Sequence, residues 1–220
     1  PTTVRLEDLF ADGSETFEFG TVIKTFRNRA SLDVSYYSKR MYDALKEADV
    51  SPASGFAKNY INTKEEITRR GLEITVNVTP IKSNNWQWDV NFNWSKYARY
   101  YTKLDPQFSA DKPWVKVGER VDHYILRDYQ RDPDGNIIHN NGDPLFSAYD
   151  SKFGNSDPDW IWGANSTLRY KAFQFNISID GRVGGIAQTT TEMYMWISGS
   201  HPNSVIPERY LDATAGGSNY

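Results

Sequence analysis

The sequence predicts an all-β fold, in which antiparallel strands form a segment of a transmembrane β-barrel with long extracellular loops. The first observation is the stretch Trp86–Ser95, WQWDVNFNWS, in which apolar and polar residues alternate strictly. The second observation is that short and long connections between the expected strands alternate along the chain. The third is strand length, because strands of about ten residues or more match the span of a tilted membrane strand.

The alternation in Trp86–Ser95 places its apolar and aromatic residues on one face of a strand and its polar residues on the other. In a soluble β-sandwich, the apolar face would pack inward on a core. In an outer-membrane barrel the same face would contact lipid, and the polar face would line a wet lumen. The stretch alone leaves both interpretations open.

The expected strands can be followed from the N-terminal end by their alternation and by turn residues. Three tight turns at 27–29, 83–85 and 171–172 each join two strands into a hairpin. The long connections span 40–58, 103–158 and 184–220. We expect one short helix in the first, short strands at 120–129 and 137–138 in the second, and irregular structure in the third. The expected strands cover about 15–26, 30–39, 60–81, 86–102, 159–171 and 173–183.

Composition limits the possible functions. Of the 220 residues, 15% are aromatic, which suits strands and the aromatic girdles of membrane barrels. The net charge of -3 comes without a basic block, so the sequence does not indicate nucleic-acid binding. No cysteine is present, so the chain has no disulfide framework and no thiolate chemistry. No apolar run reaches the ~18 residues of a membrane helix.

Under the barrel interpretation, the two strand faces supply two sets of candidate residues. The residues predicted to face lipid are Trp86, Trp88, Val90, Phe92, Trp94, Phe173, Phe175, Ile177 and Ile179. The residues predicted to face the lumen or a plug are Glu73, Asp89, Arg169 and Asp180. For this second set, the preferred interpretation is a solvated or salt-bridged wall.

The long connections contain two kinds of candidate binding residue. Aromatic residues could stack on a sugar or contact a partner, although packing of the loops on one another is the preferred alternative. These are Trp114, Tyr124, Tyr129, Tyr194 and Trp196. Asp132 and Asp134 in DPDGN could supply oxygen ligands to calcium, but Asp-Gly is also a strong hairpin-turn signal. The turn is the preferred interpretation, and no cofactor is expected.

Catalysis has little support in the sequence. The three histidines, His123, His139 and His201, have no metal-ligand spacing. The segment Ser198–His201 is not a nucleophile elbow, and the carboxylates are scattered. We therefore predict that the chain is not an enzyme.

Four segments, in this order and spacing, resemble SusC/RagA-type TonB-dependent transporters of Bacteroidota outer membranes. The longest is the strand–turn–strand segment 17–45, FEFGTVIKTFRNRASLDVSYYSKRMYDAL. Arg70–Ile74, RGLEI, resembles the recurrent Gly-hydrophobic-Glu strand of that family. Val117-Gly118-Glu119 resembles the start of its next extracellular loop, and 154–160, GNSDPDW, resembles the motif before a strand. The resemblance covers roughly 15–188.

The resemblance implies that 1–220 is part of a TonB-dependent receptor barrel, about six of the family's twenty-two strands, because so few strands cannot enclose so wide a lumen. The plug, the Ton box and the last strands have no counterpart in this sequence. The implied function is import of oligosaccharides or peptides across the outer membrane of a Gram-negative bacterium. The implied partners are a SusD-like surface lipoprotein, TonB through the absent N-terminal part, the glycan or peptide cargo and outer-membrane lipid. A soluble β-sandwich carbohydrate-binding module is the alternative.

Overall fold

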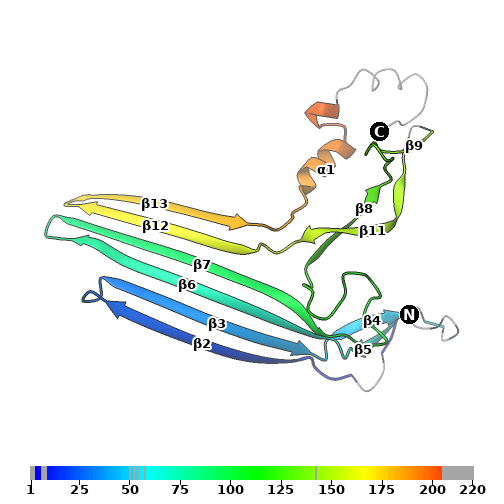
Figure 1. Ribbon diagram of the computed structural model, residues 1–220, viewed down its shortest axis with the longest axis horizontal. Coiled ribbons are helices and arrows are strands. Elements are labelled where there is room, and N and C mark those ends of the chain that lie inside the picture. Colours follow the sequence, from blue (N-terminus) through cyan, green and yellow to red (C-terminus); the bar gives the residue numbers. More distant parts are fainter. Residues whose placement is uncertain are drawn as a thin grey trace. The chain divides into compact units, whose positions relative to one another are not determined.

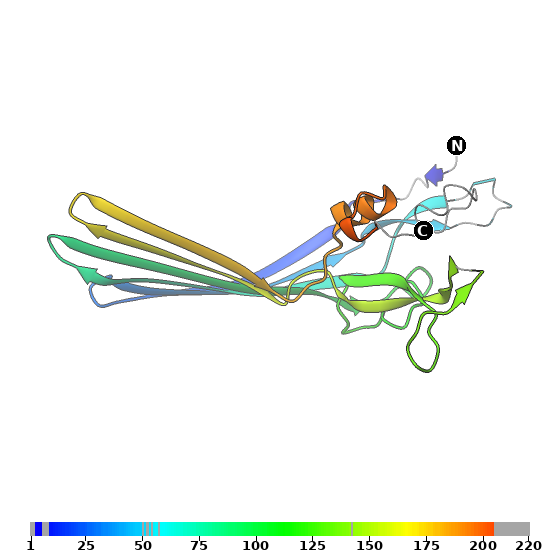
Figure 2. The same ribbon diagram turned by 90° about the horizontal axis from the view of Figure 1, so that it is seen from above.

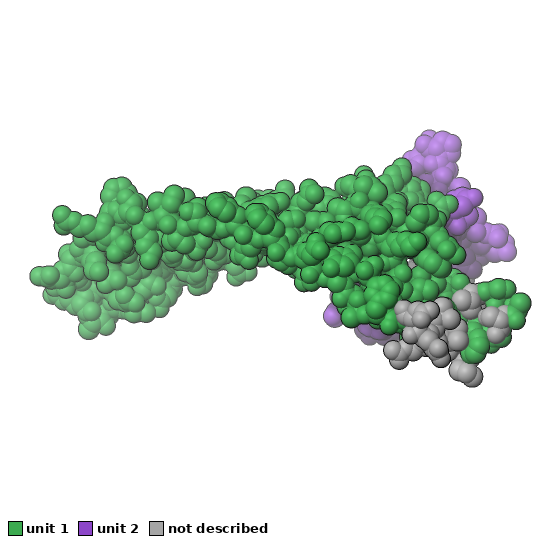
Figure 3. All heavy atoms as spheres, turned by 90° about the horizontal axis from the view of Figure 1, so that it is seen from below, with its two compact units in different colours: residues 1–123, 157–185 green, residues 124–156, 186–220 purple. Residues whose placement is uncertain are grey.

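The computed structural model describes residues 3–5, 9–49, 51, 53, 55–56, 58–141 and 143–204. The chain divides into two compact units, which Figure 3 shows in two colours. The first unit comprises 1–123 and 157–185, and the second comprises 124–156 and 186–220. Each unit is described separately below.

The first unit is built on one six-stranded sheet, in which all neighbouring strands are antiparallel (Figure 1). Its order is β13-β12-β7-β6-β3-β2, so strands that follow one another in this sheet also lie side by side. The prediction of an all-β, antiparallel fold is therefore confirmed. The six strands form an open sheet rather than a closed barrel. They are β2 (Gly13–Thr25), β3 (Ala30–Tyr42), β6 (Glu66–Lys82), β7 (Trp86–Lys103), β12 (Trp160–Tyr170) and β13 (Phe173–Val183).

Three tight turns lie at the same end of this sheet, on the left in Figure 1. They connect β2 to β3, β6 to β7 and β12 to β13. Arg27, Asn28 and Lys171 in these turns have positive φ angles of 56°, 64° and 50°. A left-handed backbone is what a short hairpin turn needs to match the twist of its strands. The long connections leave from the other end of the sheet.

The predicted strand at 60–81 is wrong at its start, because it consists of two strands, β5 (Lys58–Asn62) and β6. At residues 63–65 the chain is no longer part of a strand, and side chains accept the hydrogen bonds of two backbone N–H groups there. The backbone N–H of Lys64 donates to Asp105 Oδ2 (2.7 Å), and that of Glu65 donates to Thr63 Oγ1 (3.2 Å). A contact 41 residues away, which local pattern cannot reveal, therefore ends β5.

The short helix expected in 40–58 is also wrong, because Leu45–Asp49 forms strand β4. β4 pairs antiparallel with β5, and β5 pairs in parallel with β1 (Thr3–Arg5). The local sequence ALKEA consists of good helix formers, but pairing with β5 overrides this weak preference. Strand β3 ends at Tyr42, which is three residues beyond the expected end of that strand.

The second unit contains paired strands and one helix. β8 (His123–Tyr129) pairs with β11 (Phe146–Asn155), and β9 (His139–Asn140) pairs with β10 (Asp143–Pro144). α1 (Thr190–Ile197) and the 3₁₀ helix Pro202–Ser204 replace part of the irregular structure expected for 184–220. The hydroxyl of Thr189, the N-cap residue of α1, donates to the carboxylate of Glu192 in the first turn (3.0 Å), and no side chain caps the backbone N–H groups of this helix. Residues 205–220 lie outside the described part.

Apolar burial in the described residues is slight. The buried apolar side chains there are Ala98 and Tyr101, whereas the large apolar residues of the sheet are mostly exposed. In Figures 1 and 2 the six strands form one twisted layer. In the part of the chain that the structure describes, no helix has the length and apolar character needed to cross a membrane.

Candidate functional site

The apolar residues of all six strands lie in register on one face of the sheet. Val90 of β7 lies opposite Val78 of β6 and Ser166 of β12, and Phe92 lies opposite Val76 and Ala164. Because side chains alternate between faces, this correspondence continues across the whole sheet. All nine residues predicted to face lipid lie on this face, and we call it the apolar face. It comprises alternate residues of β2, β3, β6, β7, β12 and β13 between the tight turns and the level of Trp94.

Aromatic pairs lie at both ends of the apolar face. At the tight-turn end the rings of Trp86 and Tyr170 are 4.2 Å apart between centroids. At the other end, Trp94 and Trp160 are 6.4 Å apart. Trp86 and Trp94 are eight residues apart, which corresponds to about 26 Å along an extended strand. This length suits the apolar band, about 25 Å tall, between the two aromatic girdles of an outer-membrane barrel.

The apolar face is open to solvent among the described residues. Phe173 is 78% exposed, Phe175 63% and Ile179 55%. A sandwich would bury these side chains against a second sheet. Contact of this face with lipid remains a prediction from the alternation, and the exposure agrees with it.

The opposite face carries a ladder of hydrogen bonds between side chains that crosses five strands. Ser178 Oγ donates to Asn165 Oδ1 (2.5 Å), and Asn165 Nδ2 donates to Asn91 Oδ1 (3.3 Å). Asn91 Nδ2 then donates to Asn77 Oδ1 (2.7 Å), and Asn77 Nδ2 donates to Ser31 Oγ (3.2 Å). We call this side the polar face. The ladder links neighbouring strands in the register that keeps every apolar residue on the other side.

The four residues predicted to face a lumen all lie on the polar face, and two of them are in contact. Arg169 Nη1 lies 3.3 Å from Asp89 Oδ2, and Asp89 also accepts hydrogen bonds from Thr79 (2.9 Å) and Gln87 (2.7 Å). For Asp89 and Arg169 the geometry supports the salt-bridged wall. Glu73 borders a shallow hollow with Glu18 and Asp33, and Asp180 lies opposite Gly163.

A buried ion pair fixes the long connection after β7 to the start of β12. Arg120 donates two hydrogen bonds to the buried carboxylate of Asp122, at 2.9 and 2.7 Å, and a third to Asp159 at 3.0 Å. The backbone N–H of Asp157 donates to Asp122 Oδ2 (3.0 Å), and Arg99 Nη2 lies 3.2 Å from Asp157 Oδ2. Burial alone would raise the pKa of Asp122. The hydrogen bonds from Arg120 and Asp157 and the charge of Arg120 outweigh burial and lower that pKa below its ordinary value.

A second buried carboxylate organises the turn after β7. Asp105 accepts hydrogen bonds from the backbone N–H groups of Lys64 (2.7 Å), Gln107 (2.9 Å) and Phe108 (3.1 Å). Its burial would raise the pKa of Asp105, but these three donors and the Thr63 hydroxyl lower it below its usual value.

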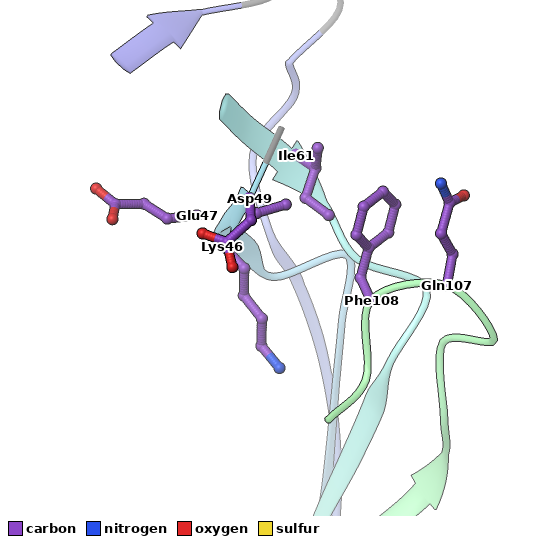
Figure 4. Close-up of a pocket in the computed structure, with 7 residues that line it drawn as sticks. Lys46, Glu47, Asp49, Ile61, Gln107 and Phe108 are labelled. Carbon is purple, nitrogen blue, oxygen red and sulfur yellow. The ribbon is translucent and has the colours of Figure 1, made fainter. Parts of the chain in front are cut away.

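Beside this turn lies an open pocket of about 380 Å³, which β4, Ile61, Gln107 and Phe108 line. Figure 4 shows the ring of Phe108 and the side chain of Ile61 close together, with the carboxylate of Glu47 pointing away from them. Glu47 is already held by Lys58 (3.3 Å) and Tyr60 (3.1 Å). The pocket therefore combines a small apolar surface with charged groups that are largely paired.

The structure does not bring the five predicted loop aromatics together as one group. Trp114 belongs to the first unit, where its ring lies 6.5 Å from that of His123, and the other four belong to the second. Tyr129 packs on Phe146 (4.8 Å) and Trp196 stacks on His201 (4.3 Å), which supports loop packing for these two. Tyr194 is 62% exposed, and Tyr124 lies in β8. Binding by these residues remains a prediction.

The DPDGN segment has the geometry of a turn. The carboxylate of Asp132 accepts from the backbone N–H groups of Asp134 (3.0 Å) and Asn136 (2.8 Å) and from the Asn136 amide (3.1 Å). The Asn136 amide is the main reason that the pKa of Asp132 lies below its usual value. Within the described ranges, no three His, Asp or Glu residues are grouped so that they could hold a metal ion. Both oxygens of Asp132 are thus engaged within the turn itself.

Sequence reasoning missed the two buried carboxylates and the polar ladder. The signal for the first was present, because Arg120 follows the Val117-Gly118-Glu119 motif and Asp157 and Asp159 lie within GNSDPDW. The structure shows that these two motifs contact each other. The ladder required knowledge of the register, which pairs Asn77, Asn91 and Asn165 across strands far apart in the sequence.

An antiparallel sheet with one apolar, aromatic-edged face and one polar face is typical of the wall of an outer-membrane β-barrel. Comparison with known proteins agrees with this class. The chain is 25% identical over 211 residues to TonB-dependent receptor P3 of Formosa agariphila, which covers 81% of this chain and 21% of that protein. It is 19% identical over 196 residues to TonB-dependent receptor SusC of Bacteroides thetaiotaomicron, covering 79% and 19%. No family model matches the chain.

The fold is similar to that of solved structures of the same kind. The RagAB peptide importer in its 'open-open' state aligns with a TM-score of 0.63 and 17% identity, over 81% of this chain and 21% of that one. The RagAB peptide transporter aligns with a TM-score of 0.56. The predicted resemblance is confirmed: the chain is similar to part of SusC/RagA-type TonB-dependent transporters. It spans about a fifth of the length of the curated relatives it matches. The prediction that the chain is not an enzyme is confirmed by these relatives, whose names are those of receptors and of a peptide importer.

Proposed function

We propose that this chain forms part of the barrel wall of a TonB-dependent transporter that imports nutrients across the outer membrane of a Gram-negative bacterium. The observation that carries the proposal is the open antiparallel sheet, whose apolar face is exposed and edged by aromatic pairs. The similarity to TonB-dependent receptor P3 and to SusC supports the same assignment. The wall encloses the cargo and performs no chemistry on it.

The proposal assigns different surroundings to the two faces of the sheet. The apolar face contacts lipid, because aromatic residues at both ends favour the two membrane interfaces. The polar face lines the lumen, where the hydrogen-bonded ladder from Ser31 to Ser178 satisfies amide groups that lipid could not. The tight turns lie on the periplasmic side, and the long connections, including the Arg120–Asp122 pair, lie outside the cell.

The cargo, the partners and the size of the barrel form the finer part of the proposal. The barrel has twenty-two strands, six of them formed by this chain, and TonB acts through a plug encoded elsewhere in the protein. A SusD-like lipoprotein covers the extracellular opening. The cargo is an oligosaccharide or a peptide too large for porins. The resemblance to SusC/RagA-type transporters supports each of these points.

Fractionation of cells that carry the natural gene tests the proposal directly. An antibody against the long connection after β7 should detect a polypeptide several times longer than this chain. That polypeptide should be extracted from outer membranes only with detergent, and it should co-purify with a surface lipoprotein. A soluble polypeptide close to 220 residues would contradict the proposal and would favour the soluble binding module. The exposed apolar face gives that alternative no support.

A further inference from the structure

Three cationic side chains stand in one row across the polar face. Lys39 of β3 lies directly opposite Arg69 of β6, which lies directly opposite Arg99 of β7. On β7 this row is five residues beyond Trp94, on the side of the long connections. Like charges directly opposite each other destabilise a sheet. An anion near these three cations would therefore stabilise the sheet.

Among the described residues, carboxylates neutralise only part of this row. Arg99 is paired with Asp157 at 3.2 Å. Among the described residues, neither Lys39 nor Arg69 has an ion-pair partner, and the buried Nε of Arg69 has no hydrogen-bond acceptor. Glu18 is the acidic residue on the same face in the neighbouring part of β2, where it accepts a hydrogen bond from Ser35 (3.1 Å). Within the described part of the chain, Lys39 and Arg69 thus lack a counter-charge.

The side chain of Arg69 is held in place by two tyrosines. Its guanidinium carbon lies 4.1 Å from the ring centroid of Tyr97 and 5.7 Å from that of Tyr37. Tyr37 and Tyr97 both lie opposite Gly71 in the register, and a Cβ at Gly71 would overlap the Tyr37 ring. The missing Cβ therefore gives Tyr37 the room to lie beside Arg69.

This arrangement prepares Arg69 to bind an oxyanion. Stacking on aromatic rings uses the flat faces of a guanidinium, whereas its N–H groups donate in the plane and can grip a carboxylate with two bonds. The tyrosines also limit the rotamers of Arg69, so less entropy is lost when the ligand binds. Lys39 lies one strand away, and its positive charge would attract the same anion.

We propose that Lys39 and Arg69, beside the paired Arg99, bind the carboxylate of an acidic peptide that passes along the polar face. The proposal rests on the proposed function in one respect, because it takes the polar face to line the path of the cargo. A peptide is favoured over an acidic oligosaccharide because Tyr37 and Tyr97 turn ring faces toward Arg69, which leaves less aromatic surface on which a sugar ring could stack. Recognition in this row is by charge.

Peptide capture by the full-length protein, purified from membranes in detergent, tests the assignment. The protein is incubated with a mixture of random hexapeptides, and the bound peptides are identified by mass spectrometry. We expect enrichment of Asp and Glu over the input mixture, and loss of that enrichment in Lys39→Gln and Arg69→Gln. Lys24→Gln is the matched control, because Lys24 lies on the same face near the tight turns. For a captured acidic peptide, Arg69→Gln should raise Kd by about tenfold to a hundredfold, the value of one charge-assisted hydrogen bond.

Two further measurements separate binding from folding. Arg69→Lys keeps the charge but loses the planar fork, so it should retain part of the affinity, and the unfolding midpoint of each variant is recorded. Capture without acidic enrichment, or enrichment unchanged in both variants, would overturn the proposal. So would row-dependent capture of oligouronates in a parallel mixture without capture of acidic peptides. A large loss of stability with unchanged capture would show that the row contacts the protein's own acidic side chains, and would also overturn it. Failure of the membrane assignment is read separately, from the cell fraction in which the protein is found.

Discussion

Replacing Val90 with arginine probes the depth of the apolar face in a membrane. Val90 lies midway between Trp86 and Trp94, and each residue advances a strand by about 3.3 Å. It is therefore about 13 Å along β7 from each aromatic level, near the centre of the apolar band. Arginine on the lipid face of a barrel costs about 2–4 kcal/mol at the midplane and about 0–1 kcal/mol near the interface. We expect Val90→Arg in the full-length protein to lower the free energy of unfolding by about 2–4 kcal/mol.

Two control variants separate the effect of depth in the membrane from the effect of the sheet face on which the arginine lies. Val183→Arg makes the same chemical change on the same side of the sheet, but opposite Trp160, just beyond the level of Trp94 at the aromatic end, so it should cost about 0–1 kcal/mol. Asn91→Arg places the charge one residue along, on the polar face. It removes the bond from Asn91 to Asn77 (2.7 Å) and a longer one from Asn165, so it should cost about 1 kcal/mol.

The assay is reversible unfolding of the full-length protein in lipid vesicles by denaturant, with the fluorescence of its tryptophans as the signal. The loss in the free energy of unfolding should be largest for Val90→Arg and smaller for Asn91→Arg. For Val183→Arg it should be similar to or below that of Asn91→Arg. Equal costs for Val90→Arg and Asn91→Arg would show that the two faces have the same surroundings. Equal costs for Val90→Arg and Val183→Arg would show that depth has no effect. Either result would refute lipid contact for this face.

Three other predictions concern the loops and the polar face. Asp122→Asn should destabilise the connection after β7 by about 3–5 kcal/mol, because it leaves Arg120 buried with too little counter-charge, and hydrogen exchange of that connection should speed up accordingly. Because the pKa of Asp122 is lowered in the fold, its contribution is present above its ordinary value near 4 and is lost as pH falls below about 4; this pH dependence should be weaker in Asp122→Asn. Gly71→Ala should cost about 1–3 kcal/mol in the free energy of unfolding, since the new Cβ displaces Tyr37, whereas Gly20→Ala in β2 adds a Cβ that meets its neighbours at ordinary contact distance and should not disturb the sheet. A calcium chelator should leave the unfolding midpoint unchanged, because the turn itself satisfies Asp132; a large drop would restore the calcium hypothesis.

The sheet could be predicted because the sequence patterns that indicate it are local. Alternation in Trp86–Ser95 and in Phe173–Ile179 shows which residues share a face, and three short turns show which strands are neighbours. With hairpins fixed by their turns, the register follows within each pair. The ends of the predicted strands 159–171 and 173–183 accordingly differ from those of β12 and β13 by at most one residue.

The parts that could not be predicted depend on contacts between distant residues. β4 forms because Leu45–Asp49 finds β5, and β5 ends because Asp105 takes the backbone N–H of Lys64. Neither contact leaves a periodic trace in the sequence. The cationic row is a similar case, because Lys39, Arg69 and Arg99 are each unremarkable until the register places them side by side.

The edges of the sheet follow from the same physical argument as its faces. β2 and β13 each have one strand neighbour, so each presents a line of unpaired backbone groups among the described residues. In a membrane, an unpaired N–H or C=O group in the hydrocarbon costs several kcal/mol, so an open sheet edge is not stable there. If the apolar face contacts lipid, both edges must be paired by further strands, and six strands are too few to close on one another around a wide lumen. The proposed contact of the apolar face with lipid therefore carries a second requirement, which is that further barrel strands pair with β2 and β13.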